Sequence, residues 1–88
     1  MTFVRDPEIR LTALEGEGIV LHLNERKYFS INETGLVLLE ALREPKTLEQ
    51  LVAALEDEYD VGRDDAVRTT REFLDKCLAA NVVKAQNE

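Results

Sequence analysis

The chain has 88 residues, of which 44% are hydrophobic and 33% are charged, and it contains one cysteine. These values predict one small folded domain in the cytoplasm, without an internal disulfide and with little interior for a catalytic pocket. The net charge of −7 disfavours nucleic acids and membranes as partners, and no segment has the apolar length of a signal peptide or a transmembrane helix.

The first third of the chain has the pattern of three short strands. Apolar and polar residues alternate over 9–14, and the two glycines that follow predict a turn. A second strand is expected over 19–23 and a third over 27–31, which is rich in aromatic and β-branched residues. The short polar link between them is typical of a hairpin, so the sequence predicts a three-stranded antiparallel meander.

Three helices are expected after these strands. Asn32 is a favourable N-cap for the first helix, whose almost entirely apolar sequence predicts burial. Thr47 opens the second helix with the spacing of a capping box. The third helix is expected over about 63–80, with Asn81 as a left-handed cap, and the last residues, 84–88, are expected to be frayed.

The order of three strands and three helices predicts an α+β fold. We expect one winged helix-turn-helix-like domain over 1–88, with a folded core of about 9–83. The third helix has two usable faces. One face contains Ala66, Thr70, Phe73 and Cys77, and the other contains Val67, Arg71, Leu74 and Leu78. One face can therefore pack on the core while the other contacts a ligand.

The sequence contains no catalytic or metal-binding constellation. His22 lies on a strand among apolar residues, which is typical of packing. Cys77 lies on an apolar helix face without a neighbouring base, which is typical of a structural thiol. The acidic cluster of residues 56–65 lacks the alternating oxygen ligands of a calcium loop. We therefore expect a binding protein without cofactor or metal, not an enzyme.

DNA binding is the alternative function, since winged helix domains commonly bind DNA. A recognition helix usually carries more cations than anions. The third helix carries four cations (Arg63, Arg68, Arg71 and Lys76) and four anions (Asp64, Asp65, Glu72 and Asp75). This balance disfavours a DNA-binding helix.

Several segments resemble the PqqD family. They are GIVLHLN over 18–24, KYFSINETG over 27–35, LEQLVAAL over 48–55 and YDV over 59–61. The most characteristic part is the strand that ends in Tyr-Phe and is followed by Asn32 and Gly35. The resemblance extends from about residue 9 to 83. It departs from the family where the link 24–26 lacks a glycine and where Asn81 replaces a common glycine.

This resemblance implies a recognition element for ribosomally made, post-translationally modified peptides. Such proteins bind the leader of a precursor peptide and present its core to maturation enzymes. Those enzymes are a leader peptidase and a cyclase in lasso-peptide pathways, or a radical SAM enzyme as in pyrroloquinoline quinone biosynthesis. A free-standing chain suits either setting, so the pathway stays open.

The third strand would bind such a peptide along its edge. An unpaired edge accepts an extended peptide as a further strand, and the third helix would form the far wall of the groove. We expect the peptide-binding residues to be Lys27, Tyr28, Phe29, Ser30 and Ile31 of the strand and Val67, Arg68, Arg71, Leu74, Asp75 and Leu78 of the helix. Tyr28 and Phe29 point to opposite faces, so one of them faces the groove, and the sequence leaves open which one.

Overall fold

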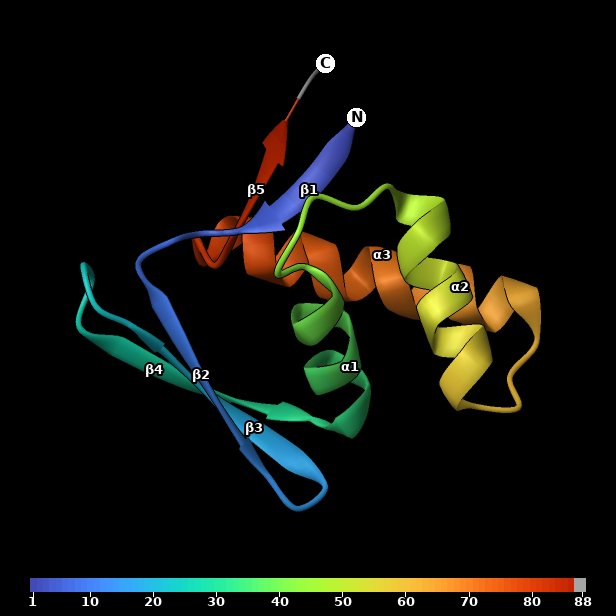
Figure 1. The fold of residues 1–88 in the computed structure, drawn as a ribbon, viewed down its shortest axis with the longest axis horizontal. Coiled ribbons are helices and arrows are strands. Elements are labelled where there is room, and N and C mark those ends of the chain that lie inside the picture. Colours follow the sequence, from blue (N-terminus) through green and yellow to red (C-terminus); the bar gives the residue numbers. More distant parts are fainter. Residues whose placement is uncertain (87–88) are drawn as a thin grey trace.

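Figure 1 shows the fold as a computed structural model that describes residues 1–86. The elements are β1 (Thr2–Arg5), β2 (Ile9–Leu14), β3 (Glu17–His22), β4 (Lys27–Asn32), α1 (Glu33–Ala41), α2 (Leu48–Glu58), α3 (Arg63–Ala79) and β5 (Val83–Gln86). Strands β2, β3 and β4 form an antiparallel sheet in that order, and the three helices follow it. The predicted α+β class and its three-stranded meander are therefore confirmed.

A second small sheet joins the two ends of the chain, which we did not predict. Strand β1 pairs antiparallel with β5, and the two lie side by side in Figure 1. Residues 84–86, which we expected to fray, belong to this ladder, while 87–88 lie outside the described residues. The N–H of Phe3 also donates to the carbonyl oxygen of Lys46 at 2.7 Å. The ordered fold therefore extends beyond 9–83, because each short end strand supplies the other's backbone hydrogen bonds.

Local capping fixes where the helices begin and end. The Asn32 side chain accepts a hydrogen bond from the N–H of Gly35 at 2.9 Å, and Thr47 forms both bonds of a capping box with Gln50. Asn81 follows α3 with φ of 61°, the left-handed conformation that asparagine tolerates. All three sequence-based capping predictions are confirmed, because each depends only on neighbouring residues.

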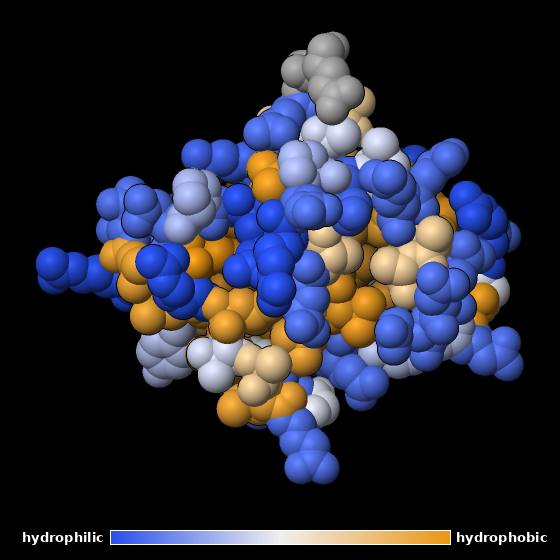
Figure 2. All heavy atoms as spheres, viewed as in Figure 1, coloured by the Kyte–Doolittle hydropathy of each residue, from blue (hydrophilic) through white to orange (hydrophobic). Residues whose placement is uncertain are grey.

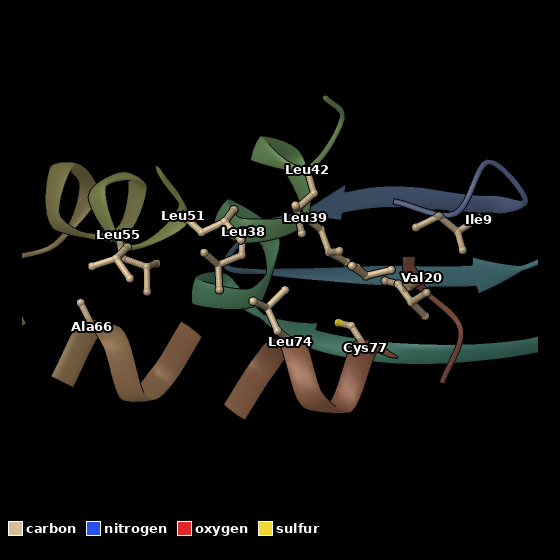
Figure 3. Packing of buried hydrophobic residues seen from close by; sticks show 13 residues of the cluster. Ile9, Val20, Leu38, Leu39, Leu42, Leu51, Leu55, Ala66, Leu74 and Cys77 are labelled. Carbon is tan, nitrogen blue, oxygen red and sulfur yellow. The ribbon is translucent and has the colours of Figure 1, made fainter. Parts of the chain in front are cut away.

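The core lies where α1 meets the sheet and the other two helices. Leu38 and Leu39 of α1 and its C-cap residue Leu42 have no exposed surface, which confirms the predicted burial of this helix. Figure 3 shows Leu74 and Cys77 pointing from α3 toward the side chains of α1 and β3. Side chains of α1, α3 and the sheet therefore belong to one core.

Apolar side chains also reach the surface of the sheet. Leu14, Leu21, Leu23 and Tyr28 are large hydrophobic residues that are well exposed. Figure 2 shows apolar patches over the region of the sheet, surrounded by hydrophilic side chains. Within residues 1–86, no helix is both long enough and apolar enough to cross a membrane.

Candidate peptide-binding groove

Strand β4 has one open edge. Within residues 1–86 it pairs only with β3, with Phe29 opposite Val20 and Ile31 opposite Gly18. In an antiparallel ladder, every second residue of an edge strand directs its N–H and C=O groups away from its partner. These groups of β4 are available to a further strand.

A cavity of about 300 Å³ lies between β4 and α3. The strand side is lined by Phe29, Ser30, Ile31 and Asn32, and the helix side by Phe73, Lys76, Cys77 and Ala80. Val20, Leu39 and Val82 complete the lining. The four helix positions are spaced at i, i+3, i+4 and i+7, so they form one face of α3. The open edge of β4 therefore borders a largely apolar groove.

The structure answers which aromatic residue of β4 faces this groove. Phe29 is half-buried and lines the cavity. Tyr28 lies on the other face of the sheet, opposite Leu21, and is 75% exposed. Lys27 is exposed at the hairpin end of the strand, outside the cavity lining. Of the five expected strand residues, the structure thus brings Phe29, Ser30 and Ile31 to the cavity.

The helix residues expected from the sequence lie elsewhere on α3. Within residues 1–86, the lining of the cavity includes none of the six helix residues that we expected to bind peptide. These are Val67, Arg68, Arg71, Leu74, Asp75 and Leu78. Leu74 is only 4% exposed and belongs to the core, while Arg71 faces solvent. Phe73 and Cys77, which line the cavity, belong to the other face of α3, the one with Ala66 and Thr70. The sequence allowed either face to pack on the core. Both faces are apolar, so only helix packing decides which one meets β4.

A second compartment continues the groove toward the N-terminal half of α3. Its volume is about 210 Å³. The lining residues are Asn32, Thr34, Gly35, Thr69, Glu72, Phe73 and Lys76. Asn32, Phe73 and Lys76 line both compartments, so the two are adjacent. The groove is therefore apolar beside Phe29 and Ile31 and polar beyond Asn32.

His22 ties the β3–β4 hairpin to the end of α3. The Nδ1 atom of His22 lies 3.3 Å from the N–H of Glu25, and its Nε2 lies 3.1 Å from the carbonyl oxygen of Asn81. Because Nδ1 accepts, Nε2 carries the proton and donates. The Asn81 amide also donates to the Glu25 carboxylate at 2.8 Å. His22 is 3% exposed, so its role is structural: it holds the β4 hairpin near the last turn of α3.

Cys77 lines the cavity, and only 7% of its surface is exposed. Burial raises its pKa from 9.0 to about 12. Since the thiolate is the reactive form, we expect native Cys77 to react with iodoacetamide at pH 8 on the order of a thousandfold more slowly than in urea. Mass spectrometry over time measures both rates. Equal alkylation rates in the native protein and in urea would contradict the burial of the Cys77 thiol.

Two of the four cations of α3, Arg63 and Arg68, form ion pairs with carboxylates. Arg68 lies 2.9 Å from the Asp65 carboxylate and 3.8 Å from that of Glu72, and Arg63 lies 3.1 Å from Glu56. Phosphate binding needs cations that are free to replace counterions.

Within the described part of the chain, no group of three or more His, Cys, Asp or Glu side chains is arranged to hold a metal ion.

Comparisons with known proteins agree with this architecture. Residues 17–83 match the family described as coenzyme PQQ synthesis protein D (PqqD). The structure of TbiB1 in complex with the TbiA(beta) leader peptide is similar at a TM-score of 0.84 and 25% identity, covering 97% of this chain and 99% of that one. The structure of a lasso peptide synthetase B1 complexed with the leader peptide is similar at a TM-score of 0.79 and 20% identity, covering 94% and 98%.

No curated protein sequence matched the chain. The family match spans β3, β4, all three helices and the first residue of β5, so it contains both walls of the groove. The chain belongs to the PqqD family.

Proposed function

We propose that this chain is a non-enzymatic module that binds the leader segment of a ribosomally made precursor peptide. The observation that carries the proposal is the open edge of β4 beside an apolar cavity. The two similar structures support it, because their names describe B1 proteins bound to leader peptides. They also favour the lasso-peptide setting over a radical SAM pathway such as that of pyrroloquinoline quinone.

Binding follows from strand addition. The leader extends the sheet as a fourth strand beside β4, and its backbone pairs with the outward N–H and C=O groups. Alternate leader side chains then point toward α3, where one apolar side chain fills the cavity. Burial of such a side chain contributes about 1.5–3 kcal/mol, which offsets part of the cost of ordering a flexible peptide.

The binding residues of this proposal come from both walls of the groove. One wall is lined by Phe29, Ser30 and Ile31 of β4, and the other by Phe73, Lys76 and Cys77 of α3 and its C-cap residue Ala80. Lys27 at the hairpin end would meet the peptide only where it leaves the strand, and Tyr28 lies on the opposite face. The bound leader is then presented to maturation enzymes, a leader peptidase and a cyclase, in the cytoplasm.

Calorimetric titration with separate leader and core peptides tests the proposal. The peptides are synthesised from a short precursor sequence identified among the genes that neighbour the gene of this chain. We expect saturable binding of the leader and none of the core. Binding of the core alone, or of neither peptide, would contradict the proposal. A duplex DNA titration at low salt tests the alternative, and we expect no shifted band.

A matched pair of variants tests the groove itself. Phe29→Ala removes a side chain that lines the cavity, whereas Tyr28→Ala removes one on the opposite face. Because the lost apolar contact contributes about 1.5–3 kcal/mol, Phe29→Ala is expected to weaken leader binding at least tenfold. Tyr28→Ala should stay within twofold of the unchanged protein. Equal effects of the two variants would place the peptide elsewhere.

A further inference from the structure

Lys76 lies where the two compartments of the groove meet. It lines the apolar cavity beside Phe29 and Ile31 and also the polar compartment beside Thr34 and Thr69. Lysine keeps its methylene stem on apolar surface while its ammonium group reaches a polar one. Its side chain therefore suits the boundary between these compartments.

The charges around the groove leave Lys76 without a partner. Lys76 and Glu72 are the charged residues that line the two compartments. The Glu72 carboxylate lies 3.8 Å from the guanidinium group of Arg68, one turn earlier on α3. Among the described residues 1–86, none of the ion pairs within 4.0 Å includes Lys76. Lys76 is thus an unpaired cation in the lining of the groove, in a chain whose net charge is −7.

This local charge matters because the rest of the molecule repels acidic peptides. An acidic surface selects against anionic ligands at long range. Lys76 is exposed in the free protein. A peptide that covers the groove would exclude part of the water around Lys76, which strengthens its attraction to a carboxylate of that peptide. The position is therefore a place where an acidic residue is favoured, in a protein that otherwise disfavours it.

We propose that Lys76 selects an aspartate or glutamate of the bound peptide, two residues from the apolar side chain that fills the larger cavity. The inference rests on the proposed strand addition. Residues i and i+2 of a strand point to the same side and are about 6.6–6.8 Å apart. Four helical residues rise about 6.0 Å, so the step from Ala80, the C-cap of α3, to Lys76 is close to that spacing. The acidic residue then contacts the ammonium group while the apolar one contacts Phe29.

Selection from a displayed library of random 15-residue peptides tests this inference without knowledge of the natural leader. The unchanged protein is expected to enrich peptides with an apolar residue and, two positions away, an acidic one. Lys76→Glu is expected to keep the apolar residue and replace the acidic one by lysine or arginine. In synthetic peptides from the selection, Glu→Gln should weaken binding to the unchanged protein about three- to tenfold, and salt should reduce the difference.

Two control variants separate the local charge from general effects. Arg71→Glu makes the same change of charge on an exposed part of α3, outside the cavity lining, and should leave the selected sequences unchanged. Glu72→Gln removes the other charge of the groove and should retain the acidic preference. If that preference disappears in either control, Lys76 is not its source.

The outcomes also separate this inference from the proposed function. Enrichment of apolar residues alone, identical for the unchanged protein and Lys76→Glu, would overturn the inference and leave peptide binding intact. Failure of the unchanged protein to enrich any sequence, together with no binding of the leader in calorimetry, would instead overturn the proposed function.

Discussion

Leu74→Asp is expected to unfold this domain at neutral pH. Leu74 is 4% exposed, and Figure 3 shows its side chain among the leucines of α1 and α2. Losing a buried leucine side chain costs about 2–5 kcal/mol, and an unpaired carboxylate in the same place costs several more. A domain of this size has a total stability of about 5–15 kcal/mol. Circular dichroism at 222 nm and urea titration measure the loss.

Arg71→Asp serves as the control for this variant. Arg71 is exposed on the same helix, so its replacement is expected to change the stability by about 0.5 kcal/mol or less. Burial would raise the pKa of an aspartate at position 74, so the variant should regain stability as the pH falls and that carboxyl becomes neutral. A folded Leu74→Asp at pH 7 that merely binds peptide weakly would show that Leu74 faces the groove after all.

Gly35→Val is expected to destabilise the protein by about 2 kcal/mol and to obstruct the groove. A Cβ atom at position 35 would lie 2.8 Å from Cε1 of Phe73 and 3.2 Å from Cβ of Ile31. The Phe73 ring must move, and it lines both compartments. The small gain in helix propensity over glycine, about 0.4 kcal/mol, does not offset this crowding. We therefore expect leader binding to weaken more than tenfold.

The double variant Gly35→Val with Phe73→Ala tests the cause. Removing the ring leaves space for valine, so the two changes should be less destabilising together than the sum of the single effects. Urea titrations of all four proteins give the coupling energy. Strict additivity would mean that Gly35 is required for a reason other than its contact with Phe73.

Local sequence patterns predicted much of this fold because they depend on neighbouring residues. The alternation over 9–14 fixed a strand whose bounds match β2, and the capping side chains of Asn32 and Thr47 fixed the starts of two helices. The pairing of β1 with β5 was missed. Its hydrogen-bonding partners lie at opposite ends of the chain, and four residues are too few for a recognisable period.

The groove shows a similar division between local pattern and packing. The sequence by itself determined that 27–31 forms the last strand of a meander and that α3 has two apolar faces. Only the tertiary structure decided that Phe29 faces inward, Tyr28 outward, and that Phe73 and Cys77, not Leu74, border β4. The physical reason is that periodicity relates the residues of one element to each other. The rotation of α3 about its axis is set by how its side chains pack against α1 and α2, and that information is distributed over the whole core.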